Sequence, residues 1–264
     1  MIRINLKPSI GLLAGLLAGL LPSCSIKEDR GECPCWLQVY AGDAGALAPV
    51  LTLSLWNGDE LCRETVPTEA SLVLDRAVPK GAVTVSAHTP LHRMRREGSL
   101  LLIPDGSECD SLLAHHGVVS CGGEAARDTV RLRAQFAVVN IAVVNLEPGV
   151  AYPYDLVVRS TVDGYDLLGG SPHAGSHSLP LRPVSEGVYR FRVPRQADGS
   201  MMLDLLMGGV PIDSLPIGEH LVLAGYDWTA PDLPEIRIEV DYGRSEPHIV
   251  IEPWLDGAVY DEVI

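Results

Sequence analysis

Residues 51–58 read Leu-Thr-Leu-Ser-Leu-Trp-Asn-Gly, and this stretch decides the fold class. Its three leucines alternate with polar residues, and a period of two is typical of a half-buried β-strand. Asn57-Gly58 follows the strand directly, and this dipeptide favours the tight turn of a β-hairpin. We therefore expect residues 50–56 to fold back onto residues 60–66 as two antiparallel strands.

Similar segments continue on both sides of this hairpin. Upstream, Trp36, Gln38 and Tyr40 fall on one face of an expected strand, and Leu37 and Val39 fall on the other. We expect further strands at residues 72–74, 83–87, 100–103, 136–146, 155–161, 188–193, 201–207, 210–215, 220–223, 236–242 and 248–252. The segment 136–146 is almost entirely apolar, which suits a central strand covered on both faces.

Helical periodicity is almost absent from the chain. Residues 108–116 fit a short helix or a strand equally well, and residues 169–183 are rich in Gly, Ser, Pro and His, which predicts an exposed loop. Short strands without intervening helices indicate an all-β fold of two tandem antiparallel β-sandwiches. The turn at Glu147-Pro148-Gly149 divides them into an N-terminal sandwich, 36–147, and a C-terminal sandwich with a strand-like tail, 148–264.

The first 23 residues have the three parts of an export signal. Arg3 and Lys7 precede an apolar run at residues 10–21, and Pro22-Ser23 leads to Cys24. A run of this length falls short of the ~20 residues that span a bilayer. We expect 1–23 to be a lipoprotein signal peptide that is cleaved before Cys24, with lipid on that thiol. The alternative is an ordinary cysteine after a cleaved secretory signal.

The net charge restricts the classes of partner. The whole chain carries −14, and without residues 1–23 it has 18 basic and 34 acidic residues, a net charge of −16. Nucleic acids and anionic membrane surfaces are bound by clustered Lys and Arg, so the composition argues against both. The length allows one or two domains, each able to bury a core.

Five cysteines follow Cys24, and outside the cytoplasm they are candidates for disulfides. An odd number leaves at least one of them unpaired, and the sequence does not choose the pairing. Cys33 and Cys35 are separated by one residue, which is the wrong spacing for a Cys-x-x-Cys redox or zinc motif. The candidates are Cys33, Cys35, Cys62, Cys109 and Cys121.

Residue groupings that could carry chemistry are sparse. His115-His116 and the pair His173 and His177 lack a third ligand at metal-site spacing, so we expect no metal and no cofactor. There is no Gly-x-Ser-x-Gly elbow and no glycine-rich phosphate loop. Acidic pairs such as Asp59-Glu60 and Asp261-Glu262 fall at expected turns or near the chain end. We expect no enzyme activity and no small-molecule substrate.

The C-terminal segment has a strand-like pattern of its own. Residues 253–257 interrupt the expected strand 248–252, and an apolar tail follows at residues 258–264. This tail either closes the second sandwich's own sheet or adds as a donor strand to another subunit's sheet, where main-chain bonds give affinity. The candidate donor residues are Val259, Tyr260, Val263 and Ile264.

Both ends of the chain resemble a known family. The segments that carry the likeness are Cys24 with residues 26–30, then Cys33-Pro-Cys-Trp-Leu37, Asp232-Leu-Pro-Glu-Ile236 and Pro253-Trp-x-Asp-Gly257. They resemble the anchor subunits (FimB/Mfa type) of Bacteroidia-type, or type V, fimbriae. The resemblance implies two transthyretin-like sandwiches, a lipid anchor in the outer membrane, and attachment and length limitation of a shaft of fimbrillin subunits. It also implies that Lys27, Glu28 and Asp29 form a signal for cell-surface exposure, with residues 24–35 as a tether.

The resemblance implies a particular place in the polymer. Shaft subunits of such fimbriae lose their first strand, which opens a groove for a neighbour's strand, whereas an anchor would keep its first strand, here 36–40. Two other classes stay open. A surface adhesin or accessory tip subunit that binds a glycan or host protein would expose aromatic side chains around Tyr226 and Trp228. A secreted hydrolase would bring a histidine, an acid and a nucleophile together.

Overall fold

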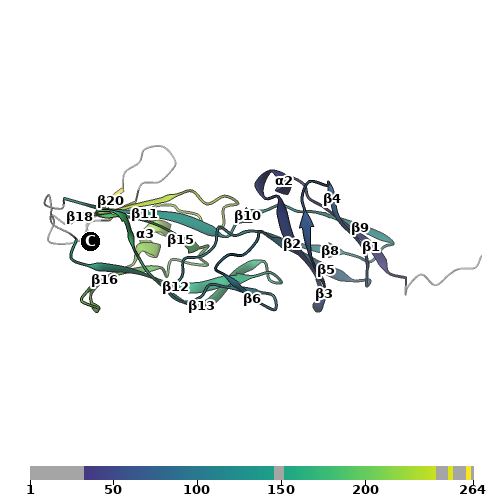
Figure 1. The fold of residues 1–264 in the computed structure, drawn as a ribbon, viewed down its shortest axis with the longest axis horizontal. Coiled ribbons are helices and arrows are strands. Elements are labelled where there is room, and N and C mark those ends of the chain that lie inside the picture. Colours follow the sequence, from purple (N-terminus) through teal and green to yellow (C-terminus); the bar gives the residue numbers. More distant parts are fainter. Residues whose placement is uncertain (1–32, 146–151, 242–248, 252–259, 263–264) are drawn as a thin grey trace, which may run out of the picture. The chain divides into compact units, whose positions relative to one another are not determined.

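The computed structural model describes residues 33–145, 152–241, 249–251 and 260–262, and most of them lie in strands (Figure 1). The predicted all-β class is confirmed, since the described strands form four hydrogen-bonded sheets and only short helices accompany them. The predicted boundary at residues 147 and 148 lies outside the described residues, and the division into two domains stays a prediction.

Two sheets come from the first half of the chain. A three-stranded sheet has the order β4-β1-β9, and a five-stranded sheet has the order β10-β8-β5-β2-β3. The short helix α2 (Ala44–Leu47) connects β1 to β2. The strands are β1 (Cys35–Tyr40), β2 (Val50–Asn57), β3 (Asp59–Pro67), β4 (Leu72–Val78), β5 (Ala82–His88), β8 (Leu113–Ser120), β9 (Ala125–Thr129) and β10 (Arg133–Ala134).

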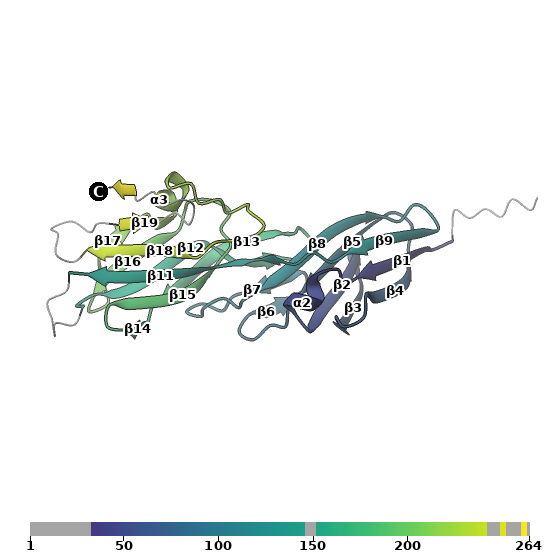
Figure 2. The same ribbon diagram turned by 90° about the horizontal axis from the view of Figure 1, so that it is seen from above.

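The predicted hairpin and the predicted alternation of the first strand are both confirmed. β2 pairs antiparallel with β3, and Gly58 has a φ of 75°, a conformation that favours glycine at this turn. In β1, Leu37 and Val39 are fully buried while Trp36 is 49% exposed. β1 lies between β4 and β9, antiparallel to the first and parallel to the second (Figure 2).

The other two sheets come mainly from the second half of the chain. One has the order β14-β15-β11-β18-β19-β20, and the other has the order β17-β16-β12-β7-β6, with β13 also paired to β12. Their elements are β6 (Arg95–Glu97), β7 (Leu100–Leu102), β11 (Phe136–Val144), β12 (Asp155–Asp166), β13 (Ser171–Pro180), β14 (Pro183–Ser185), β15 (Val188–Pro194), β16 (Met202–Met207), β17 (Val210–Leu215), α3 (Ile217–Leu223), β18 (Ile236–Asp241), β19 (Ile249–Ile251) and β20 (Tyr260–Glu262).

The apolar strand at 136–146 is central, as predicted, but it is not covered equally on both faces. β11 lies between β15 and β18, and Val139 and Ile141 are fully buried while Val138 and Ala142 on the other face stay partly exposed. Its pairing with β18 is parallel, as is that of β1 with β9. The expectation of purely antiparallel sheets is therefore wrong for these two pairs, which long chain connections bring together.

Two expected local structures are wrong. Residues 169–183 were expected to form an exposed loop, but β13 pairs along β12 and buries His177. Residues 220–223 were expected to form a strand, but they end the helix α3, in which Ile217 and Leu221 are fully buried. Residues four apart share one face of a helix, so these two side chains pack together into the core. In the undecided segment 108–116, β8 begins at Leu113.

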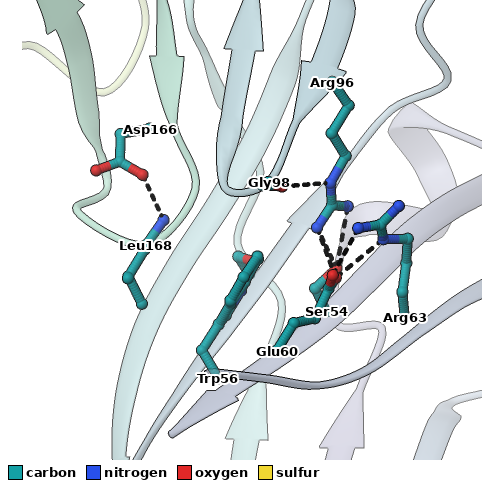
Figure 3. A network of polar contacts seen from close by, with 9 residues as sticks. Ser54, Trp56, Glu60, Arg63, Arg96, Gly98, Asp166 and Leu168 are labelled. Carbon is teal, nitrogen blue, oxygen red and sulfur yellow. Dashed lines mark hydrogen bonds and ion pairs between the residues drawn. The ribbon is translucent and has the colours of Figure 1, made fainter. Parts of the chain in front are cut away.

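A polar network joins β6 to the five-stranded sheet (Figure 3). The Arg96 guanidinium donates to Ser54 Oγ at 3.1 Å and to Glu60 Oε1 at 2.7 Å, and it lies 5.5 Å from the centre of the Trp56 ring. Arg63 also donates to Glu60, at 2.9 Å. Ser54 and Trp56 fall on the face of β2 opposite the leucines, and this arginine covers them, so both are buried.

Candidate functional site

Most of the predicted anchoring and donor residues lie outside the described residues. Cys24 and the surface-exposure signal Lys27, Glu28 and Asp29 are among them, and so are the donor candidates Val259, Val263 and Ile264. Their roles stay predictions. The remaining donor candidate, Tyr260, begins β20, which pairs antiparallel with β19 at the end of a six-stranded sheet. Here the described part of the tail extends the chain's own sheet.

The five candidate disulfide cysteines are free thiols in the structure, and they differ in their surroundings. Cys33 is exposed, and Cys62 lies half-buried on β3, where desolvation raises the pKa of its thiol. Cys109 is buried in a cluster with Trp56 and Leu101, and this burial raises the pKa of its thiol far above the usual value. Cys35 and Cys121 are both fully buried in another cluster, between the sheets of the first half of the chain.

Strand β17 is an edge strand with exposed apolar side chains. Val210 and Ile212 are 60% and 56% exposed, and Met207, just before the turn into β17, is 47% exposed. Ile212 is the extra residue of a β-bulge, where the register of β17 with β16 shifts, so Val210 and Ile212 are two exposed apolar side chains on one edge strand. The other edge strand of the same sheet, β6, carries Arg95, Arg96 and Glu97 instead. Exposed apolar side chains on an open sheet edge are typical of a strand-pairing site.

A cleft with a volume of about 760 Å³ lies beside β8 and β9. Residues of β8 and β9 line one part of the cleft, and residues 170–172, at the start of β13, line another part. Its principal polar residues are His115, His116, Arg127, Asp128, Arg131, Arg133, Gln135, Ser171, Arg195 and Gln196. Residues far apart in the sequence therefore form one basic cavity in an otherwise acidic chain.

Three arginines give this cleft its charge. Arg127, Arg131 and Arg133 are all exposed, and within the described ranges their guanidinium groups form no ion pair and no hydrogen bond. Arg195 differs, because its guanidinium donates to the carbonyl oxygens of Ala134 and Ala230 and so holds two chain segments together. The first three arginines therefore remain able to bind an anion, whereas Arg195 has a structural role.

The acidic residue among the described residues of the cleft is already paired. The backbone N–H of Arg131 donates to His115 Nδ1 at 3.1 Å, which leaves the ring proton on Nε2, 3.0 Å from Asp128 Oδ2. Burial is the largest effect and raises the pKa of the Asp128 carboxyl, but the contacts with His115, the backbone N–H of Thr129 and the charge of Arg131 together hold this pKa below its usual value. The arginines of the cleft therefore face an ionised carboxylate that already accepts hydrogen bonds from His115 and Thr129.

The expected exposed aromatic patch is absent from the described surface near Trp228. This side chain is only 6% exposed and contacts Tyr226 edge to face, with ring centres 4.7 Å apart. The Tyr226 hydroxyl donates to the carbonyl oxygen of Pro234 at 2.9 Å. Both rings pack against the core of the second half of the chain, so that prediction of the adhesin hypothesis is wrong.

The histidines are held in separate small contacts. His173 Nδ1 lies 2.7 Å from Asp163 Oδ1, and His116 Nε2 lies 3.1 Å from the carbonyl oxygen of Leu168. Among the residues with described positions, no three His, Cys, Asp or Glu side chains are placed to hold a metal ion. In the same part of the chain, no helix is long and apolar enough to cross a bilayer.

Little in the sequence indicates that these residues form a cleft. Arg131 and Arg133 alternate, which places them on one face if the segment is extended, but nothing near them in the sequence identifies His116, Ser171 or Arg195 as neighbours. These residues meet only because β8, the start of β13 and the end of β15 come together in the folded chain.

Comparisons with models of protein families and with curated proteins find no match. Solved structures do match. A candidate polysaccharide-binding protein from Bacteroides thetaiotaomicron has a TM-score of 0.63 at 13% identity, over 87% of this chain and 98% of that one. The fimbrial anchor protein Mfa2 from Porphyromonas gingivalis has a TM-score of 0.60 at 12% identity, over 88% of this chain and 100% of that one.

A candidate adhesin from Bacteroides ovatus is similar to the same degree, with a TM-score of 0.59 at 12% identity, over 90% of this chain and 98% of that one. Each of these structures matches along almost its whole length. The predicted resemblance to fimbrial proteins of the Bacteroidia type is thus confirmed for the fold.

Proposed function

We propose that this chain is a lipid-anchored, cell-surface subunit that attaches a fimbrial shaft to the outer membrane and limits its length. Lipid on Cys24 would hold it in the membrane, and residues 24–35 would be the tether. The proposed partner is a fimbrillin-type shaft subunit, bound by strand addition or edge contact. The function is association, without covalent catalysis or a cofactor.

The observation that carries this proposal is the place of β1. It begins at Cys35, the last residue of the proposed tether, and pairs on one side with β4 and on the other with β9. The position that a neighbour's strand would fill, if the first strand were missing, is therefore filled by the chain's own strand. This supports a subunit that ends a polymer rather than one that continues it in both directions.

Among the sheet edges of the described residues, two are candidates for the contact with a shaft subunit. β17 presents Val210 and Ile212 beside an unpaired strand edge, and β20 ends the other large sheet. Main-chain hydrogen bonds along such an edge give affinity, and apolar side chains on alternate positions give specificity. We place the shaft contact at one of these edges, with the tail 258–264 as the candidate donor.

A substitution that prevents lipid attachment at Cys24, made in cells of the source strain, tests this proposal. We expect Cys24→Ala to release this protein and the shaft together into the medium, because the anchor would carry the whole fimbria with it. Immunoblots of cells and medium measure this release, and electron microscopy measures fimbrial length. Cys33→Ala is the matched control, since Cys33 is exposed and nine residues away, and it should leave both proteins on the cells.

A tail deletion locates the contact in the same assay. Removal of residues 258–264 should leave this protein on the cell surface but release the shaft, if the tail is the donor. A shaft that stays on the cells after Cys24→Ala has released this protein would overturn the role as base anchor.

The cleft favours a second candidate function, an adhesin or accessory tip subunit that binds an acidic glycan. Arg127, Arg131 and Arg133, whose guanidinium groups have no ion-pair partner among the described residues, line a cavity of about 760 Å³ on an acidic protein. Carboxylates of uronic acids form paired hydrogen bonds with guanidinium groups, which gives both affinity and geometry. The buried state of Trp228 makes charge, rather than aromatic stacking, the basis of this binding.

A comparison of polygalacturonate with uncharged dextran distinguishes binding by charge from binding by aromatic stacking. We expect the full-length protein to bind polygalacturonate in calorimetry, and added salt to weaken the binding because it screens the arginines. Arg131→Glu should weaken binding about 10-fold, a loss typical of one charge-assisted contact, and the control Arg95→Glu, on β6 and outside the cleft, should not. Equal binding of dextran, or no effect of Arg131→Glu, would contradict the hypothesis.

A further inference from the structure

Cys35 and Cys121 lie against each other in the core. Cys35 is the first residue of β1, and Cys121 follows the last residue of β8. Both are 0% exposed, and the Cys35 side chain is within hydrogen-bonding reach of the Cys121 thiol. The two residues are far apart in the sequence, so only the fold makes them neighbours.

Backbone pairing on both sides fixes this contact. The N–H of Cys121 donates to the carbonyl oxygen of Gly81 at 2.7 Å, which continues the ladder of β8 with β5. The N–H of Trp36 donates to the carbonyl oxygen of Glu124 at 2.8 Å, where the pairing of β1 with β9 starts. Only residues 122 and 123 separate Cys121 from Glu124, so the backbone pairing of the two sheets holds the thiols close together.

We propose that Cys35 and Cys121 form a disulfide in the exported protein and that it joins the start of β1 to the end of β8. The inference rests on the proposed function for the oxidising location of the protein and for the membrane tether that transmits force to β1. The other cysteines are poor alternatives. Cys33 is exposed, Cys62 lies on the edge strand β3 beside Arg76, and Cys109 belongs to a different buried cluster.

The bond forms by exchange with a disulfide-containing oxidant, such as a thiol oxidoreductase. The two thiols lose two protons and two electrons as the sulfur–sulfur bond forms, and the oxidant's disulfide is reduced to two thiols. Burial and the contact with Cys35 raise the pKa of Cys121 to about 11, and neither thiol is accessible in the folded chain. Reaction therefore occurs while the sheets are still assembling, before the core excludes the oxidant.

The bond changes how a pulling force enters the protein. In its absence, tension on a membrane tether before Cys35 acts first on the hydrogen bonds of β1 with β4 and β9. With the bond in place, the same tension passes from Cys35 to Cys121 and into β8, which is paired with β5 and β10 inside the five-stranded sheet. β1 cannot then be peeled from its sheet one residue at a time.

Thiol mapping of the full-length protein tests the pairing. The chain is reduced in denaturant, refolded with reduced and oxidised glutathione, denatured again and alkylated. We expect label on Cys33, Cys62 and Cys109, and on Cys24 where it carries no lipid, together with a disulfide-linked peptide pair that contains Cys35 and Cys121. Cys35→Ser should leave Cys121 alkylated, and the control Cys62→Ser should leave the bond intact.

Thermal unfolding gives a second readout. Reduction should lower the unfolding temperature of the wild-type protein by about 5–10 °C, because the bond closes a long loop in the unfolded chain, and should not change that of Cys35→Ser. Another partner for Cys35, or alkylation of both thiols after refolding to the native far-ultraviolet spectrum, would overturn the proposal. These measurements use purified protein, so their outcome is independent of the shaft-release experiment.

Discussion

Gly164→Ala should destabilise the protein by about 3 kcal/mol or more, the upper range for a side chain forced into a packed interior. A Cβ atom at this position would lie 2.2 Å from the carbonyl oxygen of Leu101 and 3.2 Å from the Cα of Leu102. Gly164 is paired with Leu102 where β12 meets β7, so the clash is with the backbone and cannot be relieved by a side-chain rotation. Urea unfolding monitored by circular dichroism measures the loss.

Gly122→Ala is the matched control for this substitution. Its Cβ would meet nothing closer than the Ser120 hydroxyl, at 4.0 Å, and we expect a change in the free energy of unfolding within about 0.5 kcal/mol. If the two variants were equally stable, the close packing of β12 against β7 would be wrong.

Arg96→Met should cost about 2–3 kcal/mol of unfolding free energy, because it removes one member of a largely buried ion pair and leaves Glu60 with Arg63 as its remaining arginine donor. The arginine side chain is 10% exposed and that of Glu60 is 23% exposed. Methionine keeps an apolar side chain of similar length over Trp56, so the lost free energy of unfolding measures the polar contacts of Arg96. The neighbouring Arg95→Met, on the exposed face of β6, should change stability little.

The loss of stability in Arg96→Met should also depend on pH. The hydrogen bond from Arg63, opposed by burial and assisted by the charge of Arg96, holds the pKa of Glu60 below its usual value of 4.5. The folded state therefore binds the proton less readily than the unfolded state, and the stabilisation is present above pH 4.5 and is lost as the pH falls through the folded-state pKa. The stability difference between wild type and Arg96→Met should shrink in this acidic range, and a constant difference would contradict the role of Glu60.

The local strand pattern could be predicted because it depends on neighbouring residues. The leucines at 51, 53 and 55, the turn at Asn57-Gly58 and the alternation of β1 all appear in the structure as expected. Each signal is contained within a few residues, because side chains of a strand alternate between two faces. The all-β class follows from the repetition of such signals along the chain.

Segments whose structure depends on a distant partner could not be predicted. Residues 171–180 have a loop-like composition and became β13 because β12 supplies the backbone partner. The helix α3 was missed because its signal consists of Ile217 and Leu221 fitting the core on one face, whereas the composition of 220–223 suits a strand.

The sequence by itself determined the class of fold and many of the strands, and it suggested the family resemblance and the expected anchor at Cys24. Only the tertiary structure decided that Arg96 covers Ser54, that unpaired arginines gather around one cleft, and that Cys35 meets Cys121. The physical reason is the range of the interactions. Alternation and turns act between residues adjacent in the chain, whereas these contacts join strands whose pairing is set by the whole arrangement of sheets.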